Sequence, residues 1–139
     1  MANEELIASV KTIVSLLKSG KTDEAYHGYA ELFESSAFGG YRPEDQRQAL
    51  KLMILANKNV PTNPDASFAA AHKSALGRLE ALVAAAAEPI DYEMLGVCQQ
   101  VLGDDAAAAE SYKAGLTIER ERDPQSDLCG ALMRRVASV

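Results

Sequence analysis

The side chains with the greatest chemical potential in this chain are two histidines and two cysteines, and each stands alone in the sequence. His27 and His72 have no second histidine four residues away, the spacing at which one helix face presents a metal pair. Cys98 and Cys129 have no C-x-x-C companion. The sequence therefore predicts no metal site and no cofactor, and we expect these side chains to be packed or to face solvent.

Motifs for nucleophilic or phosphate chemistry are equally scarce. The sequence contains no G-x-S-x-G elbow, no phosphate-binding loop and no G-x-G-x-x-G after a strand. Gly39 and Gly40, before Tyr41 and Arg42, could bind an anion at the start of a helix, but such glycines more often close a loop. The acidic run at 119–123 is interleaved with arginines, as on a solvated helix face. We therefore expect that this protein is not an enzyme.

Charge and length narrow the class of protein further. A chain of 139 residues has the size of one domain, taken here as 1–139. Its formal charge of -6 argues against binding nucleic acid or an anionic membrane surface. The longest apolar run, at 81–87, is too short to cross a bilayer, and the N-terminal residues are acidic rather than a basic signal-peptide head. A cytoplasmic protein is the expectation.

The elements that must position any site are helices. Apolar residues recur at helical spacing throughout, and Gly and Pro interrupt the pattern at regular intervals. Thr22 or Asp23, Asp65 and Ser126 are expected as helix caps. No strand pattern is present, so we predict an all-α fold. The expected helices span approximately 3–18, 22–38, 43–57, 65–87, 89–102, 105–122 and 126–139.

One spacing, Gly-x4-Ala-x3-Tyr, occurs twice. Each copy fits a turn followed by the first half of a second helix: glycine permits the tight turn, alanine allows close approach of two backbones, and the aromatic ring fills the space one turn further on. The two copies are Gly20, Ala25 and Tyr29, and Gly103, Ala108 and Tyr112.

The segment 92–124 resembles a tetratricopeptide repeat, a helix-turn-helix unit with a characteristic pattern of aromatic, Leu-Gly, small and closing Pro residues. Gln99 departs from the pattern, since the family usually carries an aromatic there. The resemblance implies a right-handed superhelix of about three antiparallel helix pairs, at 3–38, 43–87 and 90–122, closed by a capping helix at 126–138. A generic helical bundle is the alternative, because short periodic helices alone do not fix the topology. The pattern is met by Tyr92, Leu95, Gly96, Ala108, Tyr112 and Pro124.

Such a unit implies a protein–protein interaction adaptor or scaffold that holds a peptide or amphipathic helix of another protein in a concave, partly apolar groove. Because Val10, Val14, Glu93 and Val97 stand where a carboxylate clamp needs basic or amide groups, an apolar partner segment is expected over an acidic tail. A self-associating homodimeric subunit and, less favoured, an enzyme of another type remain as alternatives. By the family's spacing the groove residues are Ile7, Val10, Val14, Leu17, Ile90, Glu93, Val97 and Gln100.

Overall fold

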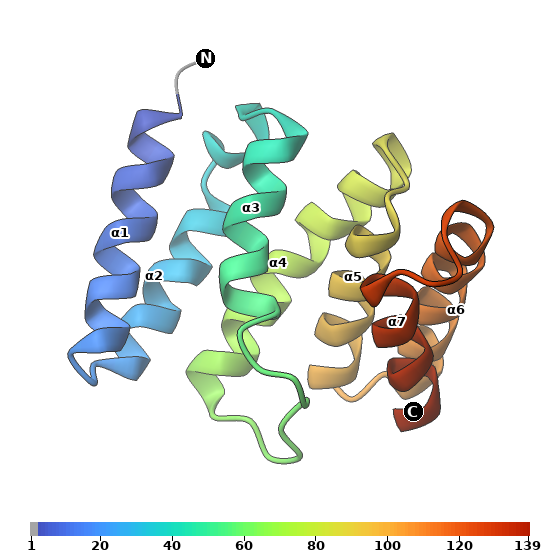
Figure 1. Cartoon of the computed structure of the whole chain (residues 1–139). Coiled ribbons are helices and arrows are strands. Elements are labelled where there is room, and N and C mark those ends of the chain that lie inside the picture. The colour runs from blue at the N-terminus through green and yellow to red at the C-terminus, as the bar shows by residue number, and fades with distance from the viewer. Residues whose placement is uncertain (1–2) are drawn as a thin grey trace.

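The computed structural model describes residues 3–139, so Met1 and Ala2 of the expected domain 1–139 lie outside the described part of the chain. Within that part the chain forms seven α-helices and one short 3-10 helix, with no strand, which confirms the all-α prediction (Figure 1). The helices are α1 (Glu4–Lys18), α2 (Thr22–Glu34), η1 (Phe38–Gly40), α3 (Pro43–Ile54), α4 (Ala66–Ala85), α5 (Pro89–Val101), α6 (Asp105–Arg122) and α7 (Asp127–Ser138).

Prolines set two of the helix starts. Pro43 and Pro89 occupy the first turns of α3 and α5, where the missing N–H has no partner to lose. Two helices end earlier than expected. The chain leaves α2 at Glu34 and forms η1, and it leaves α3 at Ile54 rather than near Asn57. The loop between α3 and α4 therefore begins at Leu55 and is longer than the sequence predicted.

Side-chain capping occurs at only some of the expected positions. Ser126 accepts a hydrogen bond from the backbone N–H of Cys129 at 3.0 Å, as predicted, and Asp104 does the same for Ala107 at 3.2 Å. Asp65 stands at the N-cap of α4, but its side chain makes no capping hydrogen bond within residues 3–139. The expectation that Thr22 or Asp23 caps α2 is wrong, because the helix already begins at Thr22 after Lys21.

The helices pack in sequence around one continuous core. In Figure 1, α1, α3 and α7 stand toward the viewer, with α2, α4 and α6 behind them. Successive elements contact one another as α1 with α2, α4 with α5, α5 with α6 and α6 with α7, and α2 packs directly on α4. By contrast, α3 touches α4 and α5 only lightly.

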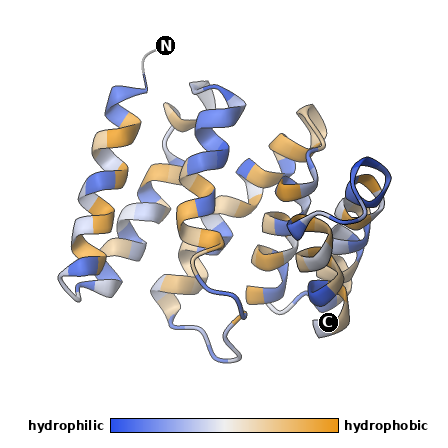
Figure 2. Cartoon of the chain, in the orientation of Figure 1, coloured by the Kyte–Doolittle hydropathy of each residue, from blue (hydrophilic) through white to orange (hydrophobic). Residues whose placement is uncertain are grey.

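Hydropathy follows this packing. Figure 2 shows apolar residues along the inner faces of the helices, whereas the α3–α4 loop and the turn before α7 are mostly hydrophilic. Both tyrosines and both alanines of the repeated Gly-x4-Ala-x3-Tyr spacing are fully buried. Their glycines, Gly20 and Gly103, have φ of +79° and +86°, the left-handed conformation that favours glycine at a turn. The turn role assigned to this spacing is confirmed.

In the last helix pair, α5 and α6 approach each other closely at Gly96. Gly96 of α5 faces the ring of Tyr112 of α6, and a Cβ at Gly96 would lie 2.6 Å from Cδ1 and 2.8 Å from Cζ of that ring. Gln99, the departure from the repeat pattern, accepts a hydrogen bond of 2.6 Å from the Ser111 hydroxyl. A polar pair thus joins α5 to α6 where the family uses an aromatic.

In the first helix pair a glycine also lies against a large side chain, but here the glycine is on the second helix and the large side chain is on the first. Ile13 of α1 occupies the place that Gly96 has in α5, and the small residue is Gly28 of α2. A Cβ added at Gly28 would lie 3.0 Å from Ile13 Cγ1.

The buried hydroxyl of Tyr29 has no hydrogen-bond partner among residues 3–139. Its counterpart Tyr112 donates to Gln100, and the residue at the matching place in α1 is the apolar Leu17.

Candidate functional site

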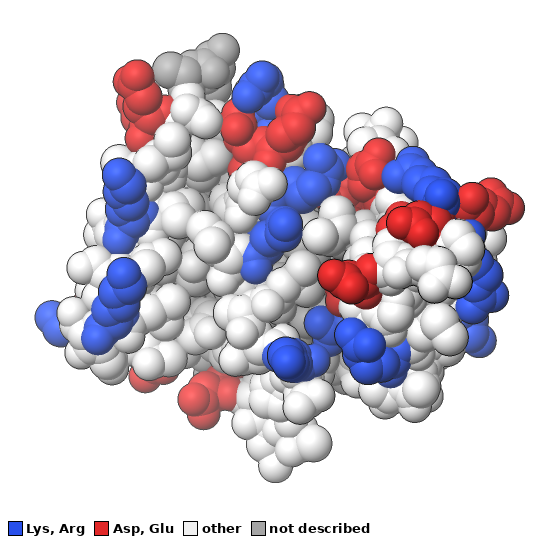
Figure 3. Space-filling view, viewed as in Figure 1, with Lys and Arg blue, Asp and Glu red and all other residues white. Residues whose placement is uncertain are grey.

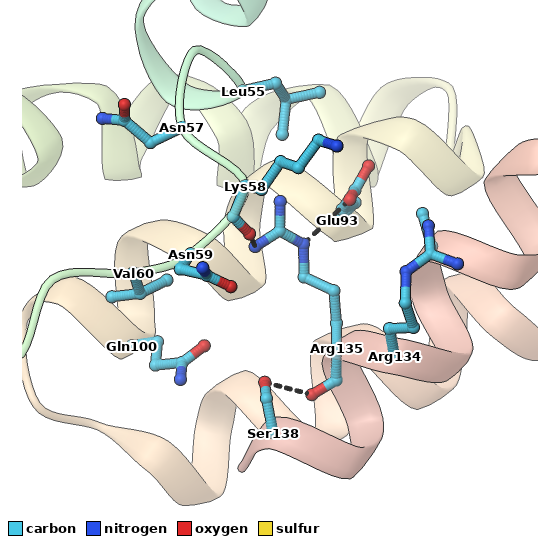
Figure 4. Close-up of a pocket in the computed structure, with 11 residues that line it drawn as sticks. Leu55, Asn57, Lys58, Asn59, Val60, Glu93, Gln100, Arg134, Arg135 and Ser138 are labelled. Atoms are coloured by element: carbon cyan, nitrogen blue, oxygen red, sulfur yellow. Dashed lines mark hydrogen bonds and ion pairs between the residues drawn. The ribbon is translucent and has the colours of Figure 1, made fainter.

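A cavity of about 670 Å³ lies between the α3–α4 loop, α5 and α7. Figure 4 shows the side chains of these three segments converging on it, with Asn59 and Gln100 toward one end and Arg135 reaching across its middle. Its edges are formed by exposed residues, so the cavity is an open cleft; we call it the α5–α7 cleft. Its lining residues are Leu55, Asn57, Lys58, Asn59, Val60, Glu93, Gln100, Ala131, Arg134, Arg135 and Ser138.

An ion pair between α3 and α5 lies next to the side of the cleft that the α3–α4 loop forms. Arg47 donates from Nε and Nη2 to the two carboxylate oxygens of Asp91, at 2.7 and 2.8 Å. Asp91 is completely buried, and the hydrogen bonds that its carboxylate accepts from Arg47 raise the pKa of Arg47. This fork joins α3 to α5, beside the core packing of α3, and so contributes to the position of the loop that follows α3.

On the opposite side of the cleft, a second arginine attaches α7 to α5 and to the α3–α4 loop. Arg135 of α7 donates from Nε to a Glu93 carboxylate oxygen at 2.9 Å, and both side chains are largely buried. The same guanidinium donates from Nη1 to the backbone carbonyl of Lys58 at 3.4 Å (Figure 4). One side chain from α7 therefore contacts both other segments of the cleft, and Glu93 is neutralised by it.

At one end of the cleft, a hydrogen bond from Tyr112 of α6 holds the Gln100 side chain in place. The Tyr112 hydroxyl donates to Gln100 Oε1 at 2.9 Å. Burial raises the pKa of Tyr112 to about 12, against the opposing effect of the nearby Arg135 guanidinium, so the phenol stays a neutral donor. With its oxygen occupied, the Gln100 amide keeps its N–H groups for the cleft, where it lies half-buried.

The electrostatic balance of the cleft differs from that of the whole molecule. Its lining contains three cations, Lys58, Arg134 and Arg135, and one anion, Glu93, whereas the chain carries a formal charge of -6. Lys58 and Arg134 are exposed and form no ion pair within residues 3–139. Figure 3 shows basic side chains gathered between the α3–α4 loop and α7. The cleft is thus a locally positive region on an acidic protein.

The structure brings only two of the eight sequence-predicted groove residues to this cleft, Glu93 and Gln100. Val97 is buried in the core and Ile90 is half-buried outside the cleft lining. In α1, Ile7 is 45% exposed, and the remaining predicted residues are half-buried without lining the cleft. Those residues are Val10, Val14 and Leu17.

The positive lining comes from the α3–α4 loop and from α7, the helix expected to cap the fold. Lys58 lies in the α3–α4 loop, which contains two prolines and several asparagines. Arg134 and Arg135 are adjacent residues of α7. The two adjacent arginines in the sequence indicate a basic site on this helix. That they lie opposite the loop depends on how α7 packs against α5.

The residues with intrinsic reactivity lie outside the cleft. His72 is buried, and its Nδ1 donates to the Phe68 carbonyl at 2.8 Å. Cys98 and Cys129 are free, buried thiols, and burial raises the pKa of Cys98 well above its usual range. Across residues 3–139 no group of three or more His, Cys, Asp or Glu side chains is arranged to hold a metal ion. In the same range, no helix combines the length and apolarity required to cross a bilayer.

Comparisons with protein-family models, with curated proteins and with solved structures each returned no match for this chain.

Proposed function

We propose that this protein is an interaction module, an adaptor of tetratricopeptide-like architecture that holds a peptide segment of another protein in the α5–α7 cleft. The observation that carries the proposal is the cleft itself, which measures about 670 Å³, is bordered by three segments and has exposed polar side chains at its edges, among them Asn57, Lys58, Asn59 and Arg134. Such groups at the surface of an open cleft offer hydrogen bonds and charge to a ligand.

The open shape favours a peptide over a small molecule. Asn57, Lys58 and Asn59 on one edge and Arg134 and Ser138 on the other are exposed, so a small ligand would keep much of its surface in water. A peptide chain can enter and leave the cleft at its open edges. This site differs from the groove expected from the family's spacing, since most of that groove's residues do not line the cleft, and the groove stays a separate prediction.

A selection from a displayed library of short random peptides tests the proposal. Ala131 lines the cleft from α7, and Ala137 lies on the same helix outside the lining. Peptides selected on the wild-type protein should lose most of their affinity for Ala131→Phe, which fills the cleft, and keep it for Ala137→Phe. If Ala131→Phe loses helical content, Asn59→Phe in the exposed loop replaces it. Equal binding to all of these variants would show that the peptides bind elsewhere.

A further inference from the structure

We propose that the α5–α7 cleft selects an acidic peptide segment, one whose Asp or Glu side chains are interspersed with apolar residues; this inference rests on the proposed function. It begins from the charges of the lining. Because Arg135 neutralises Glu93, the two cations left to a ligand are Lys58 and Arg134. Neither has an ion-pair partner within residues 3–139.

The negative charge of the whole molecule does not prevent this selection. Charges separated by more than a Debye length, about 8 Å at physiological ionic strength, are largely screened in solution. A bound segment therefore responds chiefly to the groups that line the cleft, where cations outnumber the one paired anion. Complementary charge of this kind contributes to the selection of a partner and to the rate of encounter.

The apolar part of the lining favours mixed rather than purely acidic segments. Leu55, Val60 and Ala131 are all half-buried and lie among the polar groups, so each leaves some apolar surface for a partner side chain. Removing such surface from water contributes about 25 cal/mol per Å². No aromatic residue is among the lining, so the cleft offers no ring on which a nucleic-acid base could stack.

Charge reversal gives the sharpest test. The double variant Lys58→Glu/Arg134→Glu alters exposed cleft residues, and Lys113→Glu/Arg120→Glu makes the same charge change on exposed residues of α6 outside the lining. The library is displayed through the peptides' C-termini, so no free terminal carboxylate is offered. Peptides enriched on the wild type and on the α6 variant should be acidic, and those enriched on the cleft variant should be neutral or basic.

A direct affinity measurement separates charge from shape. One enriched acidic peptide is compared with its Gln/Asn counterpart by fluorescence anisotropy, and the counterpart should bind about tenfold more weakly, with the difference shrinking at high salt. Equal affinities, unchanged selection by the cleft variant, or displacement by a short single-stranded oligonucleotide would overturn the inference. If the enriched peptides are uncharged but still blocked by Ala131→Phe, the proposed function stands and this inference fails. If Ala131→Phe and Asn59→Phe block nothing, both fail.

Discussion

The Arg135 guanidinium lies 2.9 Å from the Glu93 carboxylate, and this contact joins the last helix to α5 at the α5–α7 cleft. The relationship has a double effect. It places α7 opposite the α3–α4 loop, and it removes the one acidic side chain of the lining from competition for a ligand. The cleft therefore depends on an ion pair that is itself largely buried.

Breaking this pair should destabilise the protein. Arg135→Met leaves the Glu93 carboxylate buried without its partner, and we expect the free energy of unfolding in urea to fall by about 3 kcal/mol. The double variant Arg135→Met/Glu93→Leu should recover most of that loss. Arg122 and Glu88 are also 2.9 Å apart but exposed, so Arg122→Met is the control and should change little. Equal losses for Arg135→Met and Arg122→Met would contradict the role given to burial.

The two repeated tyrosines should respond differently to loss of their hydroxyls. Tyr112→Phe removes the donor to Gln100 and should cost about 1 kcal/mol of unfolding free energy. Tyr29→Phe removes a buried hydroxyl that has no partner within residues 3–139, and should be neutral or stabilise by up to about 1 kcal/mol. Urea unfolding of both variants measures the difference. Equal destabilisation would mean that the Tyr29 hydroxyl is satisfied, for example by a buried water.

Two glycine substitutions should have opposite signs. Gly96→Ala places a methyl group against the Tyr112 ring and should destabilise by about 1–3 kcal/mol. Gly77, in the middle of α4, has open space where its Cβ would lie, so Gly77→Ala should stabilise by about 0.5–1 kcal/mol. Thermal melting monitored by circular dichroism distinguishes them. A tolerated Gly96→Ala would show that α5 and α6 are not as close as described.

Acid should weaken the protein partly through His72. Burial lowers its pKa below the ordinary 6.5, although the hydrogen bond to Phe68 acts in the opposite direction. In the unfolded chain this imidazole takes up a proton as the pH falls below about 6.5, whereas in the folded protein it stays neutral to lower pH. Its contribution to stability is therefore present above that pH and is lost as the pH falls.

The measurement is the free energy of unfolding between pH 7 and pH 5. His72→Gln should show a shallower decline than the wild type. An unchanged slope in His72→Gln would show that the pKa of this histidine does not differ between the folded and unfolded states.

Local signals predicted much of the fold because they act within one or two helical turns. Pro43, Pro89, Gly103 and Ser126 each begin or end a helix as expected. The early end of α3 was not predictable in this way. The residues after Ile54 are Leu55, Ala56 and Asn57, and none of them is a proline or glycine that would mark a helix end.

The candidate site was harder to predict than the fold, because its residues come together only through tertiary packing. Family spacing selected Glu93 and Gln100, which line the cleft, and also Val97, which the structure buries. Lys58 and Arg135 are 77 positions apart, and nothing in either local sequence shows that α7 folds back to meet the loop. The positive character of the cleft follows from that encounter.

The most direct test of the account is to map a bound peptide by NMR. A peptide selected on the wild-type protein is titrated into labelled protein, and backbone amide shifts are followed residue by residue. We expect the largest changes in the loop at 55–60, at Gln100 and along α7 from Ala131 to Ser138. Largest changes along α1 at Ile7, Val10, Val14 and Leu17, with the cleft unaffected, would contradict the account and return the binding site to the groove expected from the sequence.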